Sequence, residues 1–257
     1  MINLQKHFEK QSNLLIPLYP KFEYSFQTLI ELRKQVEEEK LLICGEMHGI
    51  KENYEAYLFL IEKLNIKQIG MEIESQELGF LLNFRPQEYL ENAGLEAKLR
   101  SMNWPDGRIS ESLLIFLQFL KQKGLKVFFF DNYKGSYNTD GLSEDEIAEA
   151  SEQFSLQRDY TMATEILAKY DSKPTLIIAG NYHAASNRNG SMTYFLEEIT
   201  KQDFPIVSLE YGKGEYYNNS QINRFKKISQ VDTPNLVHKS DSDFTLQIPV
   251  ANPVKVF

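Results

Sequence analysis

The sequence predicts a single α/β domain with a largely parallel central sheet and helices on both of its faces, a three-layer αβα arrangement. Two observations support this fold class. Short apolar runs recur along the chain, and segments with helical periodicity lie between them. Strands that alternate with helices need crossover connections, which make the strands parallel and place helices against both faces of the sheet.

The apolar runs are rich in β-branched or aromatic residues and are too short for buried helices, so each is expected to be a strand. A further run near the C-terminus predicts a sixth strand at an edge of the sheet, where an antiparallel neighbour is allowed, because Pro249 cannot donate to a ladder. The predicted strands are 41–44 (LLIC), 68–73 (QIGMEI), 126–130 (KVFFF), 175–180 (TLIIAG), 205–210 (PIVSLE) and 243–250 (DFTLQIPV).

Capping residues and apolar spacing predict the helices between these strands. Asn53 is expected to cap a helix that continues to Leu64, and Ser110 one that stops at Gly124. Ser143 and Glu146 have the spacing of a capping box, which opens a long acidic helix toward Tyr170. The stretch 191–201 (SMTYFLEEITK) predicts one more helix.

No linker or change of composition divides the chain. We therefore expect one domain over residues 1–257, with an N-terminal extension at 1–24. Residues 211–240 are polar and rich in turn-forming residues, and they are expected to form a loop or a lid.

Composition limits the partners and the compartment. The net charge of -8 argues against nucleic acid as a partner, because phosphate binding needs a basic surface. No run is long enough to span a membrane, and the N-terminal residues show no apolar signal core. A single cysteine, Cys44, fits a reducing compartment. A cytoplasmic protein with a small-molecule or peptide substrate is the expectation; the oligomeric state is left open.

Acidic and imidazole side chains follow the predicted strands. In open parallel sheets, ligands bind outside the carboxyl ends of the strands. Glu46 and His48 follow the first run between two glycines, and residues two apart in an extended segment point the same way. His183 follows the fourth run, again after a glycine. Glu72 lies at the end of the second run. The remaining strand-end residues, considered as substrate contacts, are Glu74, Asp131, Tyr182 and Glu210.

The long helix carries an arginine within its apolar stripe. Arg158 lies four residues after Phe154 and four before Met162. A guanidinium on an inward face needs an anionic partner, which the strand-end carboxylates or a substrate could supply. Two plainer interpretations stay open: Arg158 reaches solvent from the edge of the stripe, and charged residues at strand ends simply meet water.

Four motifs in order resemble the superfamily that joins erythromycin esterases, ChaN-like haem-uptake proteins and TIKI-type metallopeptidases. They are GEMHG after the first strand, GMEIE at the end of the second, RDYTMATEI in the long helix and IIAGNYHA at the end of a later strand. The segment 103–131 and the tail 242–256 are similar to parts of the same superfamily. The chain is too short for the helical region that closes over a macrolide, so the resemblance implies a small member without that lid.

The resemblance implies the catalytic residues by position. The superfamily's strand-end glutamate and histidine fall on Glu46 and His48, its second-strand glutamate on Glu72, its helical arginine on Arg158 and its late histidine on His183. Glu74 matches the pattern less well than Glu72.

These residues predict a hydrolase of an ester, lactone or amide. In a metal-free form, His48 takes a proton from water, Glu46 or Glu72 orients the imidazole, and Arg158 and His183 stabilise the oxyanion. In a metal-dependent form, a zinc, manganese or iron ion is bound by His48, His183 and one or both of Glu46 and Glu72. We favour the metal-free form, because Glu46 and His48 are so close in sequence.

Two other interpretations remain. A non-enzymatic protein could bind haem or a metal ion, with phenolate ligands chosen from Tyr133, Tyr182, Tyr211, Tyr216 and Tyr217. A scaffold that kept the fold without the activity is the third, and the complete set of predicted site residues argues against it.

Overall fold

The structure is a computed structural model that describes residues 22–83, 98–99, 106–135, 140–218, 221–225, 233–240 and 242–256. Its described strands form one sheet of nine, in the order β1-β8-β9-β6-β2-β5-β3-β4, with β7 paired to β6. The strands are β1 (Glu23–Tyr24), β2 (Leu41–Glu46), β3 (Gln68–Met71), β4 (Lys126–Phe129), β5 (Thr175–Gly180), β6 (Ile206–Asn218), β7 (Gln221–Phe225), β8 (Asn235–Ser240) and β9 (Asp243–Ala251).

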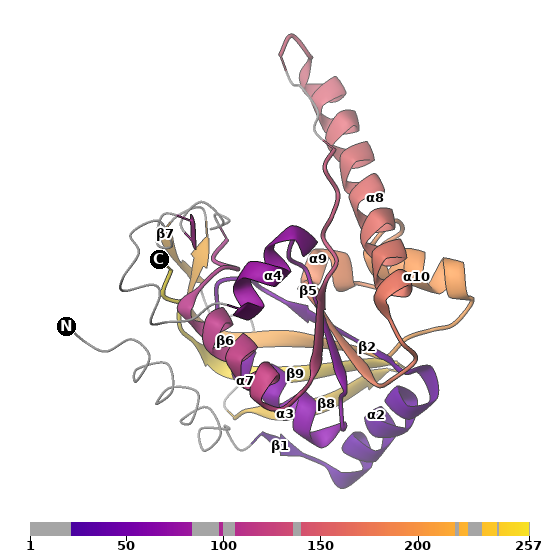
Figure 1. Cartoon of the computed structure of the whole chain (residues 1–257), viewed down its shortest axis with the longest axis vertical. Helices are drawn as coiled ribbons and strands as arrows, with labels where there is room; N and C mark the ends of the chain where they lie inside the picture. The colour runs from indigo at the N-terminus through magenta and orange to yellow at the C-terminus, as the bar shows by residue number, and fades with distance from the viewer. Residues whose placement is uncertain are drawn as a thin grey trace, which may run out of the picture.

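The centre of the sheet is parallel, as the alternation of strands and helices predicts. Strand β2 pairs in parallel with β5 and β6, and β3 pairs in parallel with β5 and β4. The described helices are α2 (Phe26–Glu39), α3 (Asn53–Lys63), α4 (Ser75–Asn83), α7 (Glu111–Gln122), α8 (Glu144–Lys169), α9 (Asn181–Ala184) and α10 (Met192–Thr200). Figure 1 shows them around the sheet.

Two separate cores confirm the three-layer arrangement. Successive side chains of a strand point to opposite faces. In β2, Leu42 and Cys44 pack into a core with residues of α2, α3 and α7, whereas Leu41 and Ile43 pack into a second core with residues of α8 and α10. The near-continuous apolar sequence of β2 follows from this burial on both faces.

Two N-cap predictions are confirmed and one is wrong. The Ser110 side chain accepts from the backbone N–H of Leu113 at the start of α7, and Ser143 and Glu146 form the capping box of α8. Ser191 caps α10. Helix α3 begins at Asn53, so Glu52 occupies the N-cap position and its side chain makes no capping hydrogen bond. The Asn53 side chain is instead hydrogen-bonded to Glu46 and to the Met47 carbonyl.

Helix α8 extends away from the sheet over its N-terminal half (Figure 1). The buried residues of α8 are Asp159, Met162, Ala163 and Ile166, all in its C-terminal part. Ile147, Ala150 and Phe154, which lie in the N-terminal half of α8, are therefore only partly buried. Arg158 lies near the point where the helix enters the body of the protein, which is what brings it to the sheet.

The C-terminal part differs from the expectation in two ways. Strand β6 continues to Asn218 and forms a hairpin with β7, and β8 begins at Asn235, so the described parts of 211–240 are mainly strand where a loop was expected. Strand β9 lies between β6 and β8, not at an edge. Pro249 is tolerated there because β8 pairs with β9 only as far as Gln247.

The expected extension at 1–24 lies outside the described residues up to position 21. Its last two residues form β1, which pairs with β8. Within the described part of the chain, no helix has both the length and the apolar character needed to cross a bilayer.

Candidate active site

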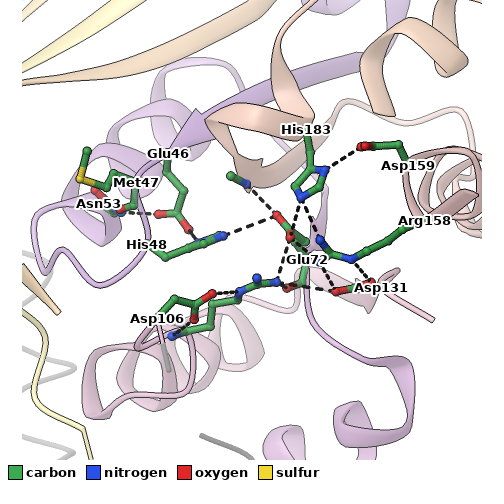
Figure 2. Close-up of polar contacts among 12 residues, drawn as sticks. Glu46, Met47, His48, Asn53, Glu72, Asp106, Asp131, Arg158, Asp159 and His183 are labelled. Carbon is green, nitrogen blue, oxygen red and sulfur yellow. Dashed lines mark hydrogen bonds and ion pairs between the residues drawn. The ribbon is translucent and has the colours of Figure 1, made fainter. Parts of the chain in front are cut away.

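The parallel register brings the ends of three strands together. Glu46 at the end of β2 lies opposite Gly180 at the end of β5, and Met71 at the end of β3 lies beside Ile178. The residues that directly follow these positions therefore meet at one edge of the sheet. Figure 2 shows Glu46, His48, Glu72, Arg158 and His183 in a single network there.

Glu72 is the centre of the network, and it is 3% exposed. Its Oε1 accepts hydrogen bonds from Arg108 Nη1 and Arg158 Nη2, both at 2.8 Å. Its Oε2 accepts from the Gly180 backbone N–H at 2.7 Å and lies 3.6 Å from His48 Nε2. Burial alone would raise the pKa of Glu72, but Arg108, His183 and His48 hold it well below its usual range.

His48 lies between two carboxylates. Its Nδ1 is 2.8 Å from Glu46 Oε1, and its Nε2 faces Glu72. Burial and the charge of Arg108 lower the pKa of His48, but the hydrogen bonds with Glu46 and Glu72 and the charge of Glu46 outweigh them and raise it to about 9. His48 is therefore an imidazolium at neutral pH.

Polar side chains from α3 and β6 hold Glu46 in place. Asn53 Nδ2 and the Tyr57 hydroxyl both donate to Glu46 Oε2. The Tyr211 hydroxyl donates to Asn53 Oδ1 at 2.7 Å and accepts from the Met47 backbone N–H. Glu46 is thus fixed on one oxygen and bonded to His48 through the other, which sets the orientation of the imidazole.

His183 is held by Asp159, the residue next to Arg158 on α8. Its Nδ1 is 2.6 Å from Asp159 Oδ1, and its Nε2 is 2.9 Å from Arg158 Nη1. An arginine can only donate, so Nε2 accepts and the hydrogen of a neutral ring lies on Nδ1. In this tautomer Nε2 has no hydrogen to donate to an oxyanion. The stabilisation of an oxyanion expected of His183 would therefore need a second proton on the ring.

Arg158 is bound by three acidic or imidazole partners. It makes a two-point contact with Asp131, from Nε at 3.1 Å and from Nη2 at 2.6 Å, in addition to its bonds with Glu72 and His183. The Asp131 hydrogen bond and the charges of Glu72 and Asp131 raise the pKa of Arg158 against the effect of burial. Of the two interpretations of Arg158, the one in which it points inward and pairs with strand-end carboxylates is confirmed.

Three of the expected substrate contacts lie apart from the network. Glu74 follows the end of β3 and contacts Gln76, because the chain turns between Met71 and Ser75 and the two glutamates do not share a face. Tyr182 is 55% exposed, with the guanidinium of Arg188 over its ring. Glu210 lies within β6, near Lys239 at 3.8 Å, because that strand continues past position 210.

Sequence reasoning missed Arg108 and Asp159. Arg108 lies in a turn of the segment NWPDGR, whose Trp104 is outside the described residues, and no periodic pattern marks such a position. Asp159 directly follows Arg158, so it could have been found from the expected inward face of α8 at that point. Asn53 was expected to cap a helix and Tyr211 to be a possible haem ligand, so their contacts around Glu46 were not foreseen.

A pocket opens on the His48 side of Glu72. Its polar wall is made by Glu46, His48, Asn53, Glu72 and Arg108, and its apolar or aromatic wall by Ile50, Tyr54, Tyr57, Met71, Ile73 and Ile178. Within the described residues, neither Arg158 nor His183 lines this pocket. The network therefore has one face toward a space for a ligand and another face inside the protein.

The arrangement does not fit a divalent cation. In the part of the chain that the structure describes, no three His, Cys, Asp or Glu side chains are grouped to hold a metal ion. Glu72, the carboxylate that both histidines approach, is already bound to two guanidinium groups. A metal ion on Glu72 would meet the like charges of Arg108 and Arg158.

The tyrosines offered for haem differ in their surroundings. Burial and the charge of Glu46 raise the pKa of Tyr211 well above its usual value, which disfavours a phenolate. The Tyr133 hydroxyl donates to Gln157 at 2.5 Å. Tyr216 and Tyr217 are half-buried on β6, near the hairpin with β7.

Comparisons with solved structures show what this fold is similar to; no protein-family model and no curated protein matches the chain by sequence. A mutant of the erythromycin esterase EreC in its open conformation matches over 90% of this chain and 95% of its own, with 13% identity and a TM-score of 0.53. A succinoglycan biosynthesis protein matches over 98% of this chain and 99% of its own, with 12% identity and a TM-score of 0.57.

Haem-bound ChaN of Campylobacter jejuni also matches, over 86% of this chain and 91% of its own, with 15% identity and a TM-score of 0.45. That score is below 0.5, so the shared fold rests on the first two structures. At these identities the likeness shows the fold alone, and the chemistry has to be argued from the site.

Proposed function

We propose that this protein hydrolyses an ester, lactone or amide, and that His48 transfers the protons. The observation that carries the proposal is the position of His48, whose ring lies between Glu46 and Glu72 and lines the pocket. The same fold occurs in an erythromycin esterase, so the scaffold is compatible with ester hydrolysis. The chemistry itself is argued from the residues of this chain.

The neutral form of His48 is the base. Glu46 accepts from Nδ1–H and so directs the lone pair of Nε2 away from Glu46, toward Glu72 and the pocket. Nε2 takes a proton from a water molecule while the water oxygen bonds to the carbonyl carbon. The bond to the leaving oxygen or nitrogen then breaks, and the imidazolium returns its proton to that atom. The products are a carboxylic acid and an alcohol or amine.

Glu72 and the arginines keep the site ready for this cycle. Glu72 stays ionised because Arg108 and Arg158 bind it, so it attracts the imidazolium that forms when the water is deprotonated. Positive charge close to the carbonyl carbon stabilises the developing oxyanion. No metal ion is needed in this scheme, and the two guanidinium groups on Glu72 favour the metal-free form.

The test is a panel of aryl esters, lactones and aryl amides assayed with the wild type, His48→Ala and His48→Gln. We expect loss of kcat by a factor of about 100 or more in both variants, because the proton-transfer group is removed. For the wild type, kcat/KM should rise with pH toward about 9, since only the neutral imidazole accepts a proton.

Wild type and variants that are equally active or equally inactive on every substrate would contradict the hydrolase. A rate that falls as pH approaches 9 would instead make the imidazolium the reactive form, with His48 as an acid. Metal analysis of protein purified without chelators or a histidine tag is the companion measurement. A stoichiometric ion whose removal abolishes turnover would overturn the metal-free scheme, and visible haem absorbance without turnover would support the binding alternative.

A further inference from the structure

The two arginines bound to Glu72 have different surroundings. Arg108 lines the pocket together with His48. Arg158 lies on the other side of Glu72, between Asp131 and His183. It is not among the described residues that line the pocket. A ligand that enters beside His48 therefore meets Arg108 first.

Arg108 is fixed in position before any ligand arrives. Its Nε donates to Asp106 Oδ2 at 2.7 Å, and its backbone N–H donates to Asp106 Oδ1 at 3.1 Å. Its Nη1 donates to the backbone carbonyl of Glu72 at 3.1 Å as well as to Oε1. A donor that is already oriented stabilises a developing charge without a reorganisation cost.

Gly107 allows the turn that presents this arginine. Its φ is +77°, a conformation that favours glycine. A Cβ atom on Gly107 would lie 2.9 Å from Tyr217 Cδ1 and 3.0 Å from Val254 Cγ2, so the backbone packs closely against β6 and the C-terminal residues. The guanidinium is thus attached to a rigid part of the protein.

The rest of the pocket is apolar. Beyond the polar wall, the lining consists of aliphatic and aromatic side chains such as Ile50, Tyr54, Ile73 and Ile178. These residues are buried, with Ile50 1% and Ile178 2% exposed. Such a wall contacts a hydrocarbon group, whereas a sugar or a peptide backbone would leave its polar groups without partners.

We propose that Arg108 is a catalytic residue that binds the carbonyl oxygen of the substrate, and that the apolar wall holds the acyl group of an ester or lactone of an aliphatic or aromatic acid. This inference rests on the proposed hydrolase function and assigns the oxyanion contact to Arg108. Arg158, with Asp131, His183 and Asp159, then holds Glu72 from behind. The reaction releases an apolar carboxylic acid whose carboxylate lies against the same guanidinium.

The first experiment compares Arg108→Gln and Arg108→Lys with Arg33→Gln. Arg33 lies on α2 and donates to the Lys63 carbonyl, so Arg33→Gln removes one arginine outside the site. On p-nitrophenyl butyrate, Arg108→Gln should lower kcat by about 100-fold with a smaller change in KM, because the contact strengthens in the transition state. Arg108→Lys should recover part of kcat, and Arg33→Gln should match the wild type.

The second experiment tests the acyl pocket with a variant that keeps every charge. Ile73→Phe adds volume to the apolar wall. It should lower kcat/KM for p-nitrophenyl octanoate by about tenfold relative to p-nitrophenyl acetate, since poor fit in an apolar pocket costs roughly this much per methylene-sized group. An unchanged ratio of the two esters would overturn the assignment of the pocket.

A third measurement separates failure of this inference from failure of the hydrolase. Calorimetric titration with octanoate should show binding to the wild type that Arg108→Gln weakens at least about tenfold, because the charged partner of the carboxylate is lost. Octanoate binding without ester hydrolysis would contradict the hydrolase function and support the acyl pocket. Ester hydrolysis by Arg108→Gln at the wild-type rate would support the hydrolase function and contradict the catalytic role of Arg108.

Discussion

Asp159 shows at the residue scale how a buried carboxylate can support a site that it does not line. It is 0% exposed, and its Oδ1 accepts from both His183 Nδ1 and the Met192 backbone N–H. Among the described residues, its Oδ2 has no hydrogen-bond partner, and it lies 3.8 Å from Arg188 Nη1. A buried charge of this kind is retained only where its partners compensate for lost hydration.

Replacing Asp159 by asparagine tests that interpretation. Asp159→Asn keeps the shape but removes the charge from two hydrogen bonds. We expect the free energy of unfolding to fall by about 1–3 kcal/mol in urea titrations. We also expect kcat to fall more than KM changes, because His183 and Arg158 lose a fixed partner behind Glu72.

The control is Asp203→Asn, at an exposed position between α10 and β6. It should stay within about 0.5 kcal/mol of the wild type and keep its activity. Asp159→Asn with wild-type stability and wild-type rates would show that the carboxylate has no positioning role.

At the scale of elements, the end of β5 approaches the candidate base so closely that an added side chain would crowd the imidazole. A Cβ atom on Gly180 would lie 3.0 Å from His48 Nε2 and 3.5 Å from Glu72 Oε2. The same glycine donates its backbone N–H to Glu72 and occupies the N-cap position of α9, which carries His183. One strand end thus sets the spacing between the two halves of the network.

Gly180→Ala is therefore expected to lower activity without unfolding the protein. The added methyl group displaces the His48 ring, and a displacement of this size costs on the order of tenfold to 100-fold in kcat. Circular dichroism and the unfolding midpoint should change little, because the contacted atoms are side-chain ends that can move.

Gly79→Ala on α4 is the matched variant. A Cβ atom there meets nothing within 4 Å, so activity should be kept and the helix slightly stabilised. If Gly180→Ala hydrolyses esters as fast as Gly79→Ala, the close approach to His48 has no catalytic meaning.

The same elements show what the sequence can predict and where it stops. Glu46 and His48 were identified because hydrophobic pattern alone places the end of a buried strand just before them. Arg108 was not identified, because a turn is fixed by tertiary contacts such as those of Asp106 and Glu72. Asn53 resembles a helix cap in sequence, and only the fold shows that its amide serves Glu46.

The extension of β6 escaped prediction for a related reason. Its second half pairs with β7 and contains polar residues that are only partly covered, so it lacks the apolar run that marks a core strand. The parallel centre was predictable, since its strands are buried on both faces. The flanking strands depend on pairing that local sequence does not encode.

At the scale of the whole molecule, His48 links the stability of the fold to pH. The pKa of His48 is raised from 6.5 in the unfolded chain to about 9 in the folded protein. The contribution of His48 to the free energy of unfolding is therefore fully present below pH 6.5 and is lost as pH rises through about 9. The difference corresponds to about 3 kcal/mol. Glu72, whose pKa is lowered, acts in the opposite direction: its contribution is lost as the solution becomes acidic.

Denaturant unfolding of the wild type and His48→Gln over this range provides the measurement. The stability gap between the two proteins should be largest near pH 6 and should shrink by about 3 kcal/mol as pH rises above 9. The carboxyls of Glu55 and Glu197, whose pKa values burial raises to about 7 and about 6, titrate in both proteins and cancel in the comparison. A gap that does not change with pH would show that His48 is not charged in the folded state.

The place of β9 has a consequence for how the chain is made. This strand comes last in the sequence, yet it lies between β6 and β8, and β1 joins the sheet only through β8 in the described topology. On a ribosome, β1 emerges before β9 and must therefore wait for β9 before its side of the sheet can assemble. Translation that stops before residue 243 leaves β6 with an uncovered edge, open to pairing with another nascent chain.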